Sequence, residues 1–197
     1  MAFNLAKFIS TYVTLDQLLT TFSPPSDLPC PLHRSPEANM ATPQLKQIPD
    51  CFHVRDPLQM VWVVEGDSLM AVPFNNNVKP VSLDIISCTD EKLHDEAKGN
   101  PVYLGIKGTN HSLFCAKIQG QPTLQIKEKN VMDLHHMNEG QKPFLFFCII
   151  EGTTSAFQSF SCPGWFIATS SMARQPITLT KERGGTENTN FYLEPEH

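Results

Sequence analysis

The sequence lacks an excess of basic charge. It has 15 Lys and Arg residues against 20 Asp and Glu residues, a formal net charge of −5 over 197 residues. Proteins that bind nucleic acids or heparin-like polyanions present a basic face, and no run of Lys or Arg indicates one here. We therefore expect no nucleic acid among its partners.

Cysteines at metal or redox spacing are also missing. No C-x-x-C pair occurs, so neither a zinc site nor a thioredoxin-type motif is indicated. Three of the cysteines lie in apolar, strand-like runs, where a free Cys behaves as a small buried hydrophobe. We expect six reduced thiols, no metal and no cofactor. The cysteines are Cys30, Cys51, Cys88, Cys115, Cys148 and Cys162.

The sequence contains no G-x-S-x-G, H-E-x-x-H, P-loop or G-x-G-x-x-G motif. His111 and Cys115 are four residues apart in a predicted strand, so they would share a face, and a Cys-His nucleophile is one interpretation. A buried core thiol is the other, and we favour it because nothing nearby resembles an oxyanion hole. His135 and His136 are adjacent and point differently, which favours surface histidines over a metal site. We expect no catalytic residues and no enzyme.

No long uninterrupted apolar run marks a signal peptide or a membrane span. Lys7 and Asp16 interrupt the apolar N-terminal segment, and no small-residue cleavage site follows an apolar core. Residues 24–50 carry seven of the 16 prolines, as expected of an extended linker. We predict a poorly ordered leader and linker over residues 1–50, a compact domain over 51–197, and no membrane insertion.

Beyond residue 51 the hydrophobic pattern has a period of two. Alternation is clear at Val81–Ile85, Thr123–Lys127 and Ile177–Thr180, and turn residues separate the runs. Only the segment around Val131–Leu134 favours a helical turn. Twelve short strands predict an all-β barrel or sandwich, and three sets of four suit a closed threefold barrel. The strands are CFHVRD, MVWVV, SLMAVP, SLDIIS, VYLGIK, SLFCAK, TLQIKE, FLFFCII, SAFQSF, WFIATS, PITLTK and FYLEP.

A turn followed by an apolar run stands out at residues 157–169. Pro163 and Gly164 predict a forced corner, after which Trp165 enters a buried strand. The segment combines an aromatic, a Ser, a Pro, a hydrophobic pair, a small residue and a Thr, with an Ile further on, and this pattern resembles the interleukin-1 family signature. Phe160 departs from it, because a smaller or aliphatic residue is usual there. The matching residues are Phe157, Ser159, Pro163, Phe166, Ile167, Ala168, Thr169 and Ile177.

Other stretches narrow the resemblance to the interleukin-36 subfamily, and together they cover roughly residues 51–194. They are Val102–Lys107, Pro122–Lys129, Pro143–Phe147, Met60–Val63 and Asn188–Leu193.

The resemblance implies a β-trefoil with three pseudo-repeats and a pro-inflammatory cytokine made in the cytoplasm without a signal peptide. Such a cytokine acts outside the cell after non-conventional release. It implies binding to the interleukin-36 receptor, then recruitment of the interleukin-1 receptor accessory protein and signalling to NF-κB and MAP kinases. We expect a monomer.

The subfamily also implies activation by N-terminal trimming, at a distance counted from an aliphatic-x-Asp motif. Val54-Arg-Asp56 matches that motif and puts the new N-terminus near Leu45. That position lies in the proline-rich linker, where a segment without regular structure is accessible to an activating protease.

Three alternatives stay open. A receptor antagonist of the same family would bind the first receptor without recruiting the second. A heparin-dependent growth factor is disfavoured by the acidic balance, and an enzyme by the missing motifs. Four loops are candidates for partner contacts, with nothing in the sequence to choose among them: Asp90–Gly99, His135–Gln141, Met172–Gln175 and Gly184–Asn188.

Overall fold

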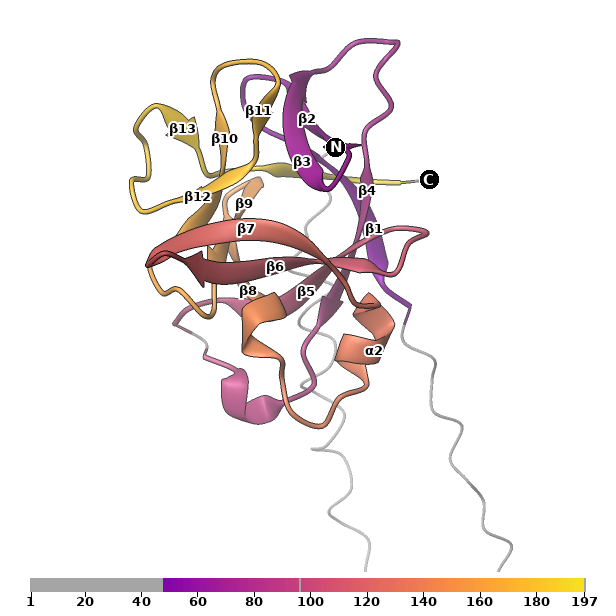
Figure 1. The fold of residues 1–197 in the computed structure, drawn as a ribbon, viewed down its shortest axis with the longest axis vertical. Coiled ribbons are helices and arrows are strands. Elements are labelled where there is room, and N and C mark those ends of the chain that lie inside the picture. The colour runs from indigo at the N-terminus through magenta and orange to yellow at the C-terminus, as the bar shows by residue number, and fades with distance from the viewer. Residues whose placement is uncertain (1–47, 96, 197) are drawn as a thin grey trace, which may run out of the picture. The chain divides into compact units, whose positions relative to one another are not determined.

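Short antiparallel strands make up most of the computed structural model, which describes residues 48–95 and 97–196 (Figure 1). The predicted new N-terminus Leu45 and the leader before Ile48 lie outside the described residues. The strands are β1 (Asp50–Arg55), β2 (Met60–Glu65), β3 (Ser68–Pro73), β4 (Ser82–Ser87), β5 (Asn100–Ile106), β6 (His111–Ile118), β7 (Gln121–Glu128), β8 (Leu145–Glu151), β9 (Thr154–Ser159), β10 (Phe166–Ser170), β11 (Gln175–Pro176), β12 (Thr178–Thr180), β13 (Glu187–Asn188) and β14 (Tyr192–Pro195). The helices are α2 (Val131–His135) and two 3₁₀ turns, Glu91–Leu93 and Lys142–Phe144.

Six of these strands close into a ring. β1 pairs with β4, β4 with β5, β5 with β8 and β8 with β9, all antiparallel. A bridge between Ser155 and Phe191 links β9 to the segment that leads into β14. β14 then pairs with β1 from Phe52↔Pro195 to Arg55↔Tyr192. Closure leaves these six strands no free edge for an unwanted pairing.

Three hairpins complete a threefold pattern. β2–β3 is inserted between β1 and β4, β6–β7 between β5 and β8, and β10–β12 between β9 and β14. Each repeat therefore contributes two ring strands and one hairpin, as the three sets of four predicted. The predicted all-β threefold barrel is confirmed.

The strand count differs from the prediction at two places. The segment PITLTK was expected to be one strand, but it is split into β11 and β12 at Ile177, whose N–H donates to the Leu69 carbonyl at 2.9 Å. The two-residue strand β13 was not predicted, because Glu187-Asn188 has no hydrophobic pattern of its own. It forms by pairing with Thr169 and Ser170 of β10. Both changes lie in the third repeat.

The alternating residues fill the ring. In β1 the alternate residues Phe52 and Val54 are buried. At the centre, the ring of Trp62 meets the edge of Phe191 at a centroid distance of 5.2 Å, and Phe157 stacks on Phe191 at 6.5 Å. The non-alternating run in β8 is buried from Leu145 to Cys148, as expected of a strand covered on both faces.

A second, smaller cluster packs α2 against the outside of the ring. Val131 and Leu134 of α2 contact a group that includes Tyr103 of β5 and Leu145 of β8. The approach is close, because a Cβ added to Gly105 would lie 2.7 Å from Cβ of Val131. The single predicted helical turn is therefore present, and a small residue in β5 makes room for it.

Phe191 bridges to β9 through its backbone and fills the central aromatic cluster with its side chain, so removal of that side chain tests the packing that supports the ring. We expect Phe191→Ala to lower the free energy of unfolding by about 3–5 kcal/mol, through lost burial and a residual cavity. Phe74→Ala is the matched control, since Phe74 is 53% exposed, and it should change stability by about 0.5 kcal/mol or less. Urea unfolding followed by fluorescence measures both, and equal effects would contradict the central role of Phe191.

Candidate functional site

The signature segment forms a tight turn and then a strand. Trp165 N–H donates to the Cys162 carbonyl at 3.1 Å, and Gly164 has φ +79°. With Pro163 at the second position and Gly164 at the third, this is a type II turn. Ser159 supports it from inside, because its hydroxyl accepts from Cys162 N–H at 3.2 Å. The predicted corner is present, while Trp165 itself is only half-buried.

Most signature side chains point inward. Phe157, Ser159, Ile167, Ala168 and Thr169 are fully buried. Ile177 is 5% exposed, Phe166 is half-buried and Pro163 is exposed in the turn. These positions are fixed by packing and turn geometry, so the signature marks the fold.

The aliphatic-x-Asp motif is also internal. Val54 and Asp56 are both 0% exposed. One Asp56 carboxylate oxygen accepts from Leu58 N–H and Met60 N–H, each at 2.9 Å. This shapes the turn between β1 and β2.

The second Asp56 oxygen joins the two motifs. It accepts from the Thr169 hydroxyl at 2.5 Å and from the Asn188 side-chain amide at 3.3 Å. Thr169 and Asn188 are register partners in β10 and β13. A buried carboxylate needs such donors to offset its lost hydration, so we name Asp56, Thr169 and Asn188 the Asp56 junction. It ties the strand nearest the linker to the loop before β14.

A second polar cluster anchors the same loop. Arg183 donates to both oxygens of Glu151 at 2.7 and 2.6 Å, and its guanidinium carbon lies 4.6 Å from the ring centroid of the signature residue Phe166. Asn190 donates to Glu151 at 2.7 Å and to Thr154 at 3.0 Å. The hydrogen bonds from Arg183 hold the pKa of Glu151 below its usual value, and Glu151 raises the pKa of Arg183.

The four candidate loops form two groups. Asp90 accepts from Gly140 N–H at 3.1 Å, and Thr89 donates to the His135 carbonyl at 3.1 Å, which joins loops 90–99 and 135–141. The other two loops follow β10 and β12, where Arg174 pairs with Glu65 at 3.0 Å. In Figure 1 the first group lies at the bottom of the fold and the second at the top. The fold thus holds two separate loop surfaces.

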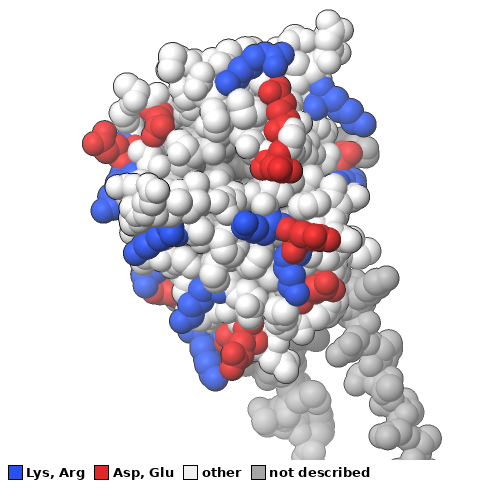
Figure 2. Space-filling model, viewed as in Figure 1, with Lys and Arg blue, Asp and Glu red and all other residues white. Residues whose placement is uncertain are grey.

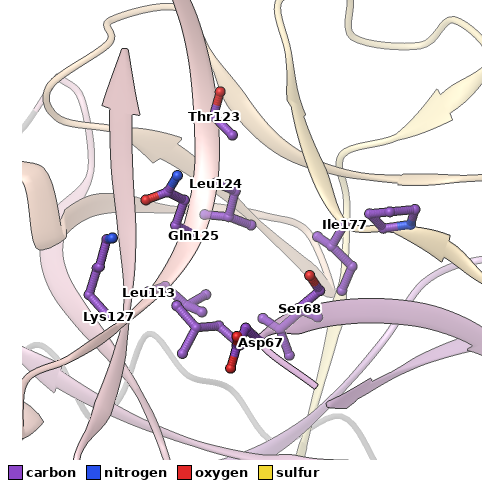
Figure 3. A pocket seen from close by; sticks show the side chains of 11 residues that line it. Asp67, Ser68, Leu113, Thr123, Leu124, Gln125, Lys127 and Ile177 are labelled. Atoms are coloured by element: carbon purple, nitrogen blue, oxygen red, sulfur yellow. The ribbon is translucent and has the colours of Figure 1, made fainter. Parts of the chain in front are cut away.

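A hollow of about 440 Å³ lies where β7 meets the β2–β3 turn and β11 (Figure 3). Its floor is apolar and includes the signature residue Ile177 together with Leu69 and Leu113, while Asp67 and Lys127 are at its rim. No His or Cys lines it. The hollow is a mainly apolar depression whose lining also includes polar side chains, among them Ser68 and Thr123.

The favoured interpretation of Cys115 as a buried core thiol is confirmed, and the alternative Cys-His pairing does not form. His111 is exposed at the start of β6, whereas Cys115 is 2% exposed and faces Cys162 in the core. The expectation that His135 lies at the surface is wrong, because its side chain is buried and its Nδ1 lies 2.9 Å from the Ser87 carbonyl. Over residues 48–95 and 97–196, no group of three or more His, Cys, Asp and Glu side chains is placed to hold a metal ion. The five cysteines in this part of the chain are all free, and Cys30 lies outside it.

Charges are mixed on the face in Figure 2, where basic and acidic side chains alternate without a continuous basic patch. None of the described helices combines the length and apolarity needed to cross a bilayer.

Sequence reasoning missed the partners of both polar clusters. Asn188 lies 132 residues from Asp56 and Arg183 lies 32 residues from Glu151, so no local pattern pairs them. The one available signal was Asp56 itself, because an Asp among strand residues needs hydrogen-bond donors if it is buried.

Comparison with known proteins shows which family the chain resembles. The family model described as Interleukin-1 / 18 matches residues 61–193. Interleukin-36 beta of Mus musculus is 53% identical over 150 residues, which are 76% of this chain and 82% of that protein. The human interleukin-36 receptor antagonist protein is 33% identical over 148 residues, 73% of this chain and 94% of its own length.

A solved structure shares the fold. The NMR structure of the pro-inflammatory cytokine interleukin-36alpha matches with a TM-score of 0.65 and 42% identity, over 76% of this chain and 94% of that one. The resemblance to the interleukin-36 subfamily is thereby confirmed, as is the β-trefoil.

The Asp56 junction generates a stability prediction. We expect Asp56→Asn and Thr169→Val each to lower the free energy of unfolding by about 1.5–3 kcal/mol, because a charged acceptor or its donor is lost in a buried site. The double variant should lose at least about 0.5 kcal/mol less stability than the sum of the losses in the two single variants. Urea denaturation of the two single variants and the double variant measures this coupling. Asp67→Asn is the exposed control, and strictly additive effects would show that the contact carries no energy.

The Glu151–Arg183 pair predicts a pH dependence. A carboxylate whose pKa is lowered by folding stabilises the protein above its unfolded value and loses that contribution as pH falls through the folded pKa. The gap in thermal midpoint between wild type and Glu151→Gln should therefore be widest above about pH 4.5 and shrink toward pH 3. Glu182→Gln, an exposed carboxylate of the same loop, is the control. A gap independent of pH would refute the ion-pair interpretation.

Proposed function

The chain belongs to the interleukin-1 family, and on this premise we propose that it is an agonist of the interleukin-36 subfamily. It binds the interleukin-36 receptor and recruits the interleukin-1 receptor accessory protein, which activates NF-κB and MAP kinase signalling. The observation that carries the proposal is the 53% identity to interleukin-36 beta across the barrel, against 33% to the receptor antagonist protein. Proteins of this family are cytokines and act by binding receptors, not by catalysis.

The two loop groups support a mechanism with two receptors. A stable interface buries about 1,600 Å² in total, so two receptors need two separate surfaces. A rigid ring with paired strands between the groups holds them at a fixed geometry, so loops that differ in sequence can contact different partners. Interface loops that are already anchored lose less conformational freedom on binding, and both polar clusters anchor the loop before β14.

We further propose that residues 1–44 are a leader whose removal activates the protein, and that residues 1–50 together form a propeptide and linker. We also propose that the protein is secreted without a signal peptide and that it acts as a monomer. The buried position of Val54 and Asp56 bears on the trimming motif. A protease cannot reach a fully buried carboxylate at the end of a paired strand, so the motif keeps a fixed position in the fold while the cut is made upstream.

The trimming proposal predicts different potencies. A chain that begins at Leu45 should activate reporter cells bearing both receptors at a concentration at least about tenfold lower than the full chain, a difference of roughly 1.4 kcal/mol in effective binding. Chains that begin at Pro43 and at Gln47 are controls for folding, because both keep β1 intact. Dose–response curves for a reporter gene measure the effect, and equal potency of full and trimmed chains would refute it.

The same chains separate agonist from antagonist. An agonist that begins at Leu45 should co-purify with both receptor ectodomains as a ternary complex. An antagonist would hold the first ectodomain, leave the second unbound and block signalling by an added agonist. That outcome would overturn the agonist assignment while leaving the family in place.

A further inference from the structure

Two thiols of the central core face each other across two repeats. Cys115 lies in β6, and Cys162 immediately precedes Pro163 in the type II turn before β10. Their Sγ atoms are 3.5 Å apart, and the side chains are 2% and 3% exposed. The other partnered thiols face oxygen: Cys51 donates to Glu196 at 3.0 Å, and Sγ of Cys88 lies 3.6 Å from the Tyr103 hydroxyl.

We propose that Cys115 and Cys162 are an oxidation site, and that they form a disulfide when the folded protein meets a low-molecular-weight disulfide such as oxidised glutathione. The bond would cross-link the second repeat to the third. Since a disulfide is about 2.05 Å long, the sulfurs must approach each other by roughly 1.5 Å. Side-chain rotation in the turn that carries Cys162 supplies this movement without disturbing the ring strands.

The turn provides the route for the oxidant. Pro163 is exposed, and residues 160–165 lie outside any strand, so four hydrogen bonds hold this turn in place of a continuous ladder. Segments of this kind open locally more readily than ring strands do. Cys162 is therefore the thiol that meets the oxidant first, whereas Cys115, in a strand paired with β7 over its whole length, stays covered.

The reaction balances as two thiol–disulfide exchanges. The Cys162 thiolate attacks one sulfur of the external disulfide and releases one thiolate of the oxidant. The Cys115 thiolate then attacks Sγ of Cys162 in the mixed disulfide and releases the second. Two protein thiols lose two electrons and two protons, and the external disulfide is reduced to two thiols.

Burial slows the second exchange. Burial, and then the hydrogen bond that Cys115 donates to Cys162, raise the pKa of the Cys115 thiol to about 11, although Ser159 opposes this. Only a small fraction is thiolate at neutral pH, so the thiols persist in the reduced state of the cytosol. We expect the disulfide to form only after the protein has left the cell, so the inference rests on the proposed secretion.

Peptide mapping tests the site on the full 197-residue chain. Folded protein is incubated with oxidised glutathione, alkylated and digested with trypsin and a Glu-specific protease. Cleavage after Glu151 separates Cys148 from Cys162. We expect Gly108–Lys117 to be linked to Gly152–Arg174, with a mass two hydrogens below the sum of the two reduced peptides. The rate of linkage should rise roughly tenfold per pH unit from pH 7 to 9, as the thiolate fraction does.

Thermal unfolding gives an independent readout. Oxidised wild type should melt roughly 5–15 °C higher than the reduced protein, and dithiothreitol should reverse the shift. Cys115→Ser and Cys162→Ser should abolish the shift, and Cys148→Ser should retain it. If Cys115→Ser and Cys162→Ser fail to fold, the peptide map of the oxidised wild-type protein still tests whether the two cysteines are linked.

Two outcomes would overturn the proposal. One is a wild-type map in which Cys115 remains fully alkylated after oxidation, and the other is a map in which Cys115 is linked to Cys148 as often as to Cys162. The test requires no receptor. A linked pair in a protein that gives no signal would contradict the proposed function alone, and an unlinked pair in an active cytokine would contradict only this inference.

Discussion

The structure depends on closure of a six-strand ring, in which the last strand must pair with the first. β14 lies along β1, and Phe191, just before β14, bridges to Ser155 of β9 and fills the centre between Trp62 and Phe157. Closure removes the exposed strand edges of an open sheet. It also brings the two ends of the domain together, because Phe52 near the start of β1 lies beside Pro195 and Arg55 at its end lies beside Tyr192.

The Asp56 junction shows how two motifs of the sequence serve this closure. The aliphatic-x-Asp motif and the signature threonine are separated by 113 residues, yet they share one hydrogen bond in the buried interior. Neither lies on a surface that a partner contacts. Sequence patterns that identify the family therefore identify its interior, because packing and buried hydrogen bonding leave few alternatives at these positions. The composition of exposed loops is far less restricted.

The same distinction between the interior and the surface explains which features of the structure could be predicted from the sequence. Alternation identified strands such as β1, in which alternate residues are buried, whereas β5 and the first half of β8 are buried without alternation. β13 and the break at Ile177 were not predictable, since both result from pairing with distant strands and not from local pattern. Cys115 could be assigned to the core from its apolar neighbours, but its contact with Cys162 depends on how two repeats pack. The partners of Arg183 were missed for the same reason.

The ring also sets a physical limit on N-terminal trimming. β1 begins at Asp50 and pairs on one side with β4 and on the other with β14. A cut inside β1 would remove pairing from both neighbours at once and leave two ring strands with unsatisfied backbone groups, a large cost in a buried setting. A cut before Ile48 removes none of these bonds. A trimmed chain that begins upstream of β1, as we propose, therefore keeps every pairing of the ring.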